Sequence, residues 1–160
     1  YLNSNRASNT DPQNSFHQSV FISTVGTSGA GQYPVYIGTS GIGGNDRNIY
    51  RDQNNGVLNA SFNSIGFSTG SGTAVGFAAQ GRSSSNATVL RVAAANIVGT
   101  SVSIAPSSNN IGIFAAPGIN LSITYNNARL AFYSIGESLD LALLDARVTA
   151  LITAFGVAIP

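Results

Sequence analysis

The densest group of charged and aromatic side chains in the chain lies between residues 45 and 52. This stretch reads Asn-Asp-Arg-Asn-Ile-Tyr-Arg-Asp and holds two of the six acidic residues and two of the seven arginines. Carboxylate, amide and guanidinium groups hydrogen-bond to sugar hydroxyls, and a tyrosine ring stacks on a sugar ring. The candidate ligand-binding residues are therefore Asn45, Asp46, Arg47, Tyr50, Arg51 and Asp52. The competing interpretation is an exposed hairpin strand whose charges keep a sheet edge soluble.

Two further patterns bear on catalysis. Residues 66–70 (Gly-Phe-Ser-Thr-Gly) match the G-x-S-x-G elbow, in which a sharp strand-to-helix turn exposes a serine to a histidine base. No helical pattern follows, and the single histidine, His17, lies upstream, so a β-turn is the alternative. A polysaccharide hydrolase would need two carboxylates flanking a bond, and the available pairs are Asp46 with Asp52, or either with Glu137. We predict no enzymatic activity and no catalytic residue.

Metal and cofactor sites are not expected either. The chain has no cysteine, which excludes disulfides and thiolate metal sites. Asp11, Asp46 and Asp52 could offer oxygen ligands to calcium, but they lack the spacing of an EF-hand loop. We therefore predict that the protein holds no metal and no cofactor.

The charge content narrows the classes of partner. Charged residues make up 8% of the 160 residues, against a usual share of about a quarter, and every cation is an arginine. A net charge of +1 offers no basic patch for nucleic acid or anionic lipid, so we expect neither partner. No uninterrupted apolar run approaches the roughly 20 residues that cross a bilayer, so we also expect no membrane insertion.

The elements that must position these residues are mostly strands. Short segments rich in Val, Ile, Phe, Tyr and Thr alternate with Gly, Ser and Asn clusters, as in antiparallel all-β domains. We expect strands near 16–24, 33–38, 47–52, 57–63, 73–79, 87–92, 100–104, 111–115, 119–124 and 129–135, with loops at 38–44 and 68–72. Residues 1–5 read as a strand already under way. We therefore expect one domain over 1–160, at the C-terminal end of a longer chain.

Side-chain alternation assigns a core face to several strands. Phe16, Gln18, Val20 and Ile22 share one face of the first long strand, and His17 shares the other. Residues 54–56 (Asn-Asn-Gly) supply the positive φ angles of a tight hairpin between two strands. The expected core between two sheets consists of Phe16, Val20, Ile22, Val35, Leu58, Phe62, Val75, Phe77, Ile113, Ile123, Leu130 and Phe132.

The spacing of apolar residues changes near the C-terminus, and the new spacing predicts one helix over about 140–155. Apolar residues from Leu141 to Phe155 recur at three- and four-residue spacing and form one stripe. Ser138 or Asp140 is expected to cap its first amides, and Gly156 to end it. Such an apolar helix must dock on the strands or on another subunit.

The second half of the chain resembles a known family. Residues 88–92 (Thr-Val-Leu-Arg-Val), 111–116 (Ile-Gly-Ile-Phe-Ala-Ala) and 128–136 (Ala-Arg-Leu-Ala-Phe-Tyr-Ser-Ile-Gly), followed by the helix, resemble the C-terminal part of concanavalin A-like (laminin G-like) β-sandwich domains of bacteriophage tail-fibre and virion proteins. The resemblance covers 87–160 and is diffuse over 1–86. It implies an antiparallel two-sheet jelly-roll sandwich with one C-terminal α-helix, but it carries over no sugar-binding or calcium-binding motif.

These observations lead to two functional hypotheses. The first is a non-enzymatic, lectin-like module of a phage tail fibre or other virion appendage, extracellular, that recognises host-surface glycans. The alternative is a structural, self-assembling subunit of a capsid decoration, fibre or extracellular filament that binds no sugar. We expect a homo-oligomer, for which the resemblance suggests a trimer, and contacts with other virion proteins. A chain with few charges suits close packing between subunits, because few charged groups must then lose their hydration.

Overall fold

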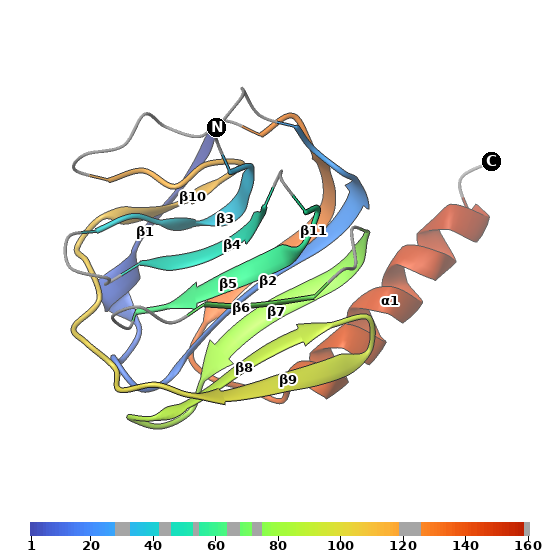
Figure 1. Ribbon diagram of the computed structural model, residues 1–160. Helices are drawn as coiled ribbons and strands as arrows, with labels where there is room; N and C mark the ends of the chain where they lie inside the picture. Colours follow the sequence, from blue (N-terminus) through green and yellow to red (C-terminus); the bar gives the residue numbers. More distant parts are fainter. Residues whose placement is uncertain are drawn as a thin grey trace.

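The protein is an all-β sandwich followed by one C-terminal helix, as the sequence predicts (Figure 1). The computed structural model describes residues 1–27, 33–41, 46–52, 55–63, 68–71, 75–118 and 126–158. Within these residues, two antiparallel sheets pack face to face, and the helix lies against the outer side of one of them. The expected antiparallel two-layer arrangement is therefore confirmed.

The sheets differ in size, and we call them sheet A and sheet B. Sheet A has six strands in the order β1 (Leu2–Ala7), β10 (Asn110–Ile113), β3 (Val35–Thr39), β4 (Arg47–Arg51), β5 (Leu58–Phe62) and β6 (Ser68–Ser71). Sheet B has five, in the order β11 (Arg129–Gly136), β2 (Phe16–Thr24), β7 (Gly76–Arg82), β8 (Ala87–Val92) and β9 (Ala95–Thr100). A short 3-10 turn, Ser8–Thr10, follows β1.

The hairpin between β4 and β5 forms where the Asn-Asn-Gly sequence predicts it. The two strands pair antiparallel from Arg47 opposite Phe62 to Arg51 opposite Leu58. Gly56 has a φ of +72° and donates its amide to the Asp52 carbonyl at 2.8 Å. The positive φ that the turn demands is therefore supplied by glycine at no steric cost. This hairpin fixes the register of the segment that carries the candidate site residues.

Three strand expectations need correction. The strand expected at 73–79 is β7, three residues later. The strand expected at 100–104 is wrong, because residues 101–104 form no strand and the strand in this region, β9, ends at Thr100. Residues 68–72 were expected to be a loop, yet Ser68–Ser71 pairs with β5 as β6. Both β6 and β9 are edge strands that pair with one neighbour, and in β6 that pairing holds a glycine, a residue of low strand propensity, in place. The strand expected at 119–124 lies outside the described residues.

The main core lies between the two sheets. Its large members come from β2 (Phe16, Val20, Ile22), from β5 (Leu58, Phe62) and from Tyr36, Ile37, Ile49, Leu90, Ile111 and Ile113. Each of these side chains is almost completely buried. Gln18 shares the core face of β2, as expected, and its side-chain amide lies 2.8 Å from the side-chain amide of Gln80. Apolar burial from both sheets is thus the main force holding the layers together.

A second, smaller cluster lies between sheet B and the helix. Phe77 and Phe132, which were expected between the sheets, pack instead with Leu141 and Val148 of the helix. A register irregularity in β11 separates Leu130, which packs on the main core, from Phe132. Val75 is 53% exposed and belongs to neither cluster, while Ile123 lies outside the described residues. Sheet B therefore has an apolar outer face, which is recognised only from its packing against the helix.

The helix α1 (Leu141–Ala158) begins where expected and ends later. Asp140 Oδ1 accepts hydrogen bonds from the amides of Ala142 and Leu143 at 2.9 and 3.1 Å, which is the predicted N-cap. The helix continues through Gly156 to Ala158, so the predicted stop is wrong. A glycine weakens a helix by about 1 kcal/mol but ends it only where a left-handed turn forms.

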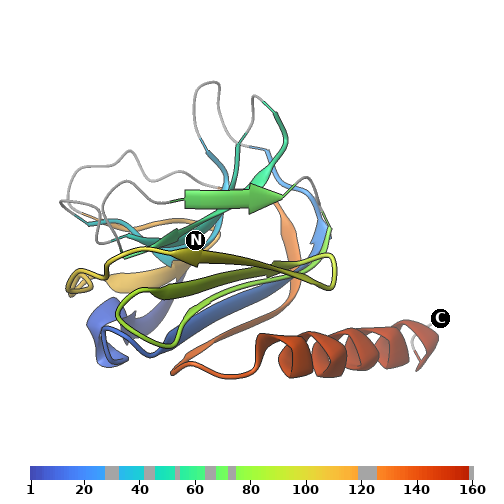
Figure 2. The same cartoon turned by 60° about the horizontal axis from the view of Figure 1, so that its bottom comes forward.

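The helix α1 is anchored to sheet B mainly through its first half, and Ile152 is the last residue that packs on the sheet. Leu141, Asp145 and Val148 are its buried residues, and Asp145 forms an ion pair with Arg91 of β8 at 2.9 Å. Figure 2 shows the helix running past the edge of the sandwich. By length and composition α1 is apolar enough to cross a membrane, a test that a buried helix in a soluble protein also passes. Unlike such a helix, α1 is only 17% buried.

Candidate functional site

A groove of about 300 Å³ lies on the outer face of sheet A. It is lined by side chains of β3, β4 and β5 and of the segments next to them: Tyr33, Val35, Asp46, Asn48, Tyr50, Ser61 and Ala116. The groove combines two aromatic rings, one carboxylate, one amide and one hydroxyl. A shallow hollow of mixed apolar and hydrogen-bonding groups is suited to a small polar ligand.

Strand alternation decides which residues of β4 reach this groove. Ile49 points into the core and is completely buried, so its neighbours Asn48 and Tyr50 point outward. Ser61 of β5 lies between the buried Ala60 and Phe62 and points outward as well. Because β4 and β5 are paired, with Asn48 opposite Ser61, their outward side chains lie side by side. The candidate site is thus a product of the hairpin register.

The aromatic wall of the groove is made by Tyr33 and Tyr50. Their ring centroids are 5.7 Å apart and the ring planes meet at 69°, an edge-to-face arrangement. Tyr33 is 48% exposed and stands just before β3, while Tyr50 is partly buried in β4. This contact holds the Tyr50 ring in place and leaves aromatic surface at the groove.

Asp46 supplies the carboxylate. Its Oδ1 accepts a hydrogen bond from the Gly41 amide at 2.5 Å, and its backbone oxygen accepts one from the Asn63 amide at 2.6 Å. Burial raises the pKa of the Asp46 carboxyl, while the hydrogen bonds from Gly41 and Ser40 oppose that shift. The carboxylate is therefore fixed in position and only partly hydrated.

Asn48 lines the groove from the middle of β4. It is 8% exposed, and its Oδ1 has no hydrogen-bond partner among the residues that the structure describes. The side chain lies above Gly38 of β3, where a Cβ would overlap Asn48 Oδ1. Glycine at position 38 is therefore what makes room for an acceptor at the floor of the groove. A buried acceptor without a partner favours a ligand that donates a hydrogen bond.

The two arginines of the candidate segment lie away from the groove. Arg47 is completely buried in the sandwich, with its guanidinium carbon 3.8 Å from the centre of the Phe16 ring and Nη1 donating to Ser8 O at 2.8 Å. Burial lowers the pKa of Arg47 to about 10. Arg51 lies opposite Leu58, a core residue, in the register of β4 and β5, and its positive charge acts on the hydroxyl of the buried Tyr36. A ligand in the groove cannot reach Arg47.

The structure therefore divides the six predicted site residues. Asp46 and Tyr50 lie together in the groove, Arg47 and Arg51 do not line it, Asp52 follows the end of β4, and Asn45 lies outside the described residues. Sequence reasoning missed Tyr33 and Ser61, because they come from other elements of sheet A. It also left out Asn48, although alternation within the same segment places it beside Asp46 and Tyr50.

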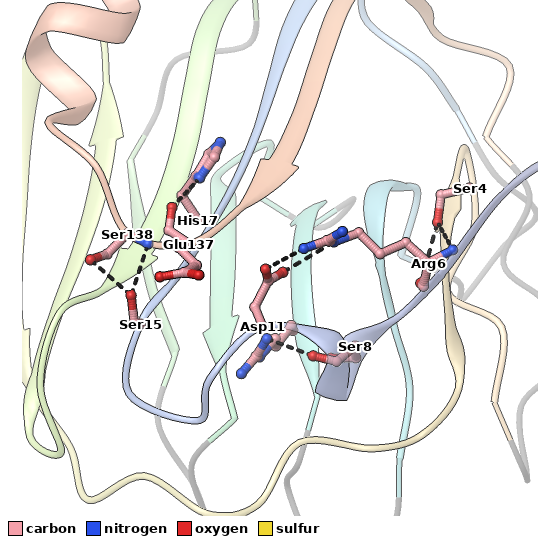
Figure 3. A network of polar contacts seen from close by, with 9 residues as sticks. Ser4, Arg6, Ser8, Asp11, Ser15, His17, Glu137 and Ser138 are labelled. Atoms are coloured by element: carbon pink, nitrogen blue, oxygen red, sulfur yellow. Dashed lines mark hydrogen bonds and ion pairs between the residues drawn. The ribbon is translucent and has the colours of Figure 1, made fainter.

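His17 belongs to a structural network on sheet B. Its Nδ1 lies 2.7 Å from Glu137 O and its Nε2 lies 2.9 Å from Ser134 Oγ. Nearby, Ser15 Oγ accepts a hydrogen bond from the Ser138 amide at 3.2 Å (Figure 3). These contacts tie β2 to the segment that leads from β11 into α1. The Ser68 of the G-x-S-x-G pattern lies in β6 of the other sheet, away from the histidine's strand.

Acidic residues do not gather into a metal site in the described part of the chain. No group of three or more His, Cys, Asp or Glu side chains that could hold a metal is found there. Asp11, one of the three acids considered for calcium, forms an ion pair with Arg6 at 2.5 Å instead. The ion pair is visible in the polar network of Figure 3.

Comparison of the chain with protein-family models, with curated proteins and with solved structures finds no match in any of the three.

Proposed function

We propose that this protein is a non-enzymatic, lectin-like module that binds host-surface glycans through the groove of Tyr33, Asp46, Asn48, Tyr50 and Ser61. The observation that carries the proposal is the grouping of two tyrosine rings with a carboxylate, an amide and a hydroxyl on one sheet face. Aromatic faces stack on the apolar side of sugar rings, and the polar groups pair with sugar hydroxyls. The groove has the size and chemistry for one or two sugar residues.

The finer fold and location belong to the same proposal. A two-sheet antiparallel sandwich with a C-terminal helix is compatible with a concanavalin A-like jelly roll. The resemblance of 87–160 to virion domains is the reason for proposing a phage tail fibre or another extracellular virion appendage. A glycan-binding module of this kind needs no cofactor and no nucleic acid.

A glycan array followed by NMR titration of the hits tests the proposal. The isotope-labelled chain should show amide shifts around β4 and β5 with at least one neutral sugar. Tyr50→Ala should weaken that binding by about five- to thirtyfold, since loss of one stacking contact is worth about 1–2 kcal/mol. Tyr33→Ala, at a more exposed position, gives a second test that leaves the core untouched.

Tyr133→Ala is the matched control, because Tyr133 is 43% exposed on β11 of the opposite sheet. Its affinity should equal that of the wild type. The proposal fails if no sugar binds the folded chain, or if the groove variants and the control bind equally well.

The second candidate function is a structural subunit that assembles through α1. Between Thr149 and Ala158 the helix carries no charged side chain, and Leu151, Phe155 and Val157 are 46%, 54% and 83% exposed. A helix that is apolar on all sides is normally covered on all sides. Crossing a membrane instead would take Asp145 and Arg147 into lipid and break the Arg91–Asp145 ion pair, so we propose a protein neighbour.

Geometry favours a second copy of the chain as that neighbour. Alanines stand at 142, 146, 150, 154 and 158, and the next row carries Leu143, Arg147, Leu151 and Phe155. The ridge of one helix therefore fits the alanine groove of another. The half of the helix from Thr149 to Ala158 is about 15 Å long and about 10 Å wide, with a lateral surface of about 470 Å², so an interface of the usual size, roughly 800 Å² per partner, also takes in surface next to the helix.

Light scattering as a function of concentration distinguishes the two candidates. The double variant Leu151→Gln with Phe155→Gln should dissociate an assembled chain, whereas Val102→Gln, at a 77% exposed apolar residue far from α1 in sequence, should not. A monomeric wild type at high concentration would remove this candidate and leave the glycan-binding proposal intact.

A further inference from the structure

The distribution of charge around the groove bears on which glycans it accepts. All seven arginines and six acidic residues of the sequence lie in the part of the chain that the structure describes. The segments outside that part contain no charged residue and no histidine. The sign of the charge at the groove is therefore settled by the described residues alone.

Asp46 is the charged residue that lines the groove. Its carboxylate is held by the Gly41 amide at 2.5 Å and stands beside Asn48 and Tyr50. Asp52, just after the end of β4, is also acidic. Any charge that the groove presents to a ligand is thus negative.

The nearby cations are directed elsewhere. Arg47 is completely buried above the Phe16 ring, and Arg82 is 1% exposed and donates to Phe62 O at 3.0 Å and Ser101 O at 2.8 Å. Arg51 lies on the side of the buried Tyr36. A sugar carboxylate is normally bound by the bidentate fork of an arginine, and the described groove offers none.

We propose that the groove selects uncharged glycans and rejects those with a carboxylate, such as uronic acids and sialic acids. This inference rests on the proposed glycan-binding function and names its substrate class. Asp46 is the specificity-determining residue: it accepts hydrogen bonds from neutral hydroxyls and repels an anion in the same position. Like charges placed together at an interface suppress the wrong partner, and the opposite arrangement would require an exposed arginine.

The test compares sugars that differ in charge and little else. The probes are methyl galactoside with methyl galacturonate, methyl glucoside with methyl glucuronate, and lactose with sialyllactose, titrated into the labelled chain at neutral pH. In every pair that binds, the uncharged member should bind about tenfold or more tightly than the acid. Asp46→Asn should bring the ratio of the two affinities close to one, because the amide keeps a hydrogen-bond acceptor and removes the negative charge.

Asp140→Asn serves as the control, since Asp140 is an exposed acid that caps α1 on the other sheet. It should leave the ratio unchanged. Equal or tighter binding of the acidic sugars by the wild type would overturn the inference while leaving the glycan-binding proposal standing. A ratio that Asp46→Asn does not alter would also overturn it, by showing that shape and not charge excludes the acids. If no probe and no arrayed glycan binds, both proposals fail together.

Discussion

At the scale of single residues, the groove depends on side chains that cost the fold some stability. Burial raises the pKa of the Asp46 carboxyl, so its charged form is less stable there than in water. Within the described part of the chain, Asn48 keeps a buried oxygen without a hydrogen-bond partner at the groove floor. Residues retained at such a cost are typical of binding sites, since optimising stability alone would replace them.

The Asp46 carboxyl gives a stability prediction with a definite sign. The pKa of this carboxyl is higher in the folded chain than in the unfolded chain. At a pH between the two pKa values the folded chain therefore holds more protons, and the free energy of unfolding falls as pH rises. Asp46→Asn should therefore be more stable than the wild type at neutral pH, and the gain should vanish below about pH 3.9, where both states are protonated. Urea unfolding at both pH values measures this. Asp140→Asn, at an exposed carboxylate, should show no such gain.

Gly38 gives a second prediction at the same scale. A Cβ at this position would overlap Asn48 Oδ1 and the Arg47 backbone oxygen, so Gly38→Ala should destabilise the protein by about 1–3 kcal/mol and displace Asn48. Gly156→Ala is its counterpart, because a Cβ there has nothing within 4 Å and lies in a helix. It should be neutral or stabilising by up to about 1 kcal/mol. Thermal unfolding of both variants decides; equal effects would contradict the crowding at Gly38.

At the scale of elements, the sequence predicts best those strands that face the core. β2, β5 and β8 carry alternating apolar residues, and their positions follow from that alternation. β6 (Ser-Thr-Gly-Ser) has no apolar residue, and half of β9 is Ala, Asn and Gly, so both depend on a neighbouring strand for their hydrogen bonds. The groove shows the same limit: Asp46 and Tyr50 are local, but Tyr33 and Ser61 join them only through pairing across β3, β4 and β5.

The docking of α1 on sheet B depends on contacts between elements, and these contacts are few. The Arg91–Asp145 ion pair is about 90% buried on both sides, with side-chain exposures of 12% and 11%, and Thr149 Oγ1 donates to Asp145 Oδ1 at 3.2 Å. Arg91→Met should leave the Asp145 carboxylate without its cation and loosen the helix by about 1–3 kcal/mol. Hydrogen exchange of the α1 amides measures this opening.

Arg129→Met is the control for helix docking, because Arg129 is exposed at the start of β11. Its α1 amides should exchange at the wild-type rate. Equal protection of α1 in the Arg91 variant and the control would mean that apolar contacts of Leu141 and Val148 suffice, and that the ion pair contributes little.

At the scale of the whole molecule, several of the few charges are used inside the fold. Three of the seven arginines make buried contacts, Arg47 and Arg82 within the sandwich and Arg91 with Asp145, while the more exposed Arg6 pairs with the buried Asp11. Arginine suits this role better than lysine because its planar fork satisfies several carbonyls at once. Arg82 does so by donating to Ser85 O, Ser101 O and Phe62 O, which bridges the two sheets.

This charge distribution predicts that the molecule responds weakly to salt. Raising the salt from about 0.01 to 1 M shortens the Debye length from about 30 to about 3 Å, which screens exposed charges and spares buried ones. Because exposed ion pairs are worth at most about 1 kcal/mol, the free energy of unfolding should change by less than that over the whole range. An assembly through the uncharged half of α1 should persist at 1 M salt for the same reason, since dissociation by salt requires charges at the interface. Chemical denaturation by urea and light scattering, both run across the salt series, measure the two effects. A large loss of stability would show that surface charges hold the sandwich together, and dissociation at high salt would place the interface away from α1.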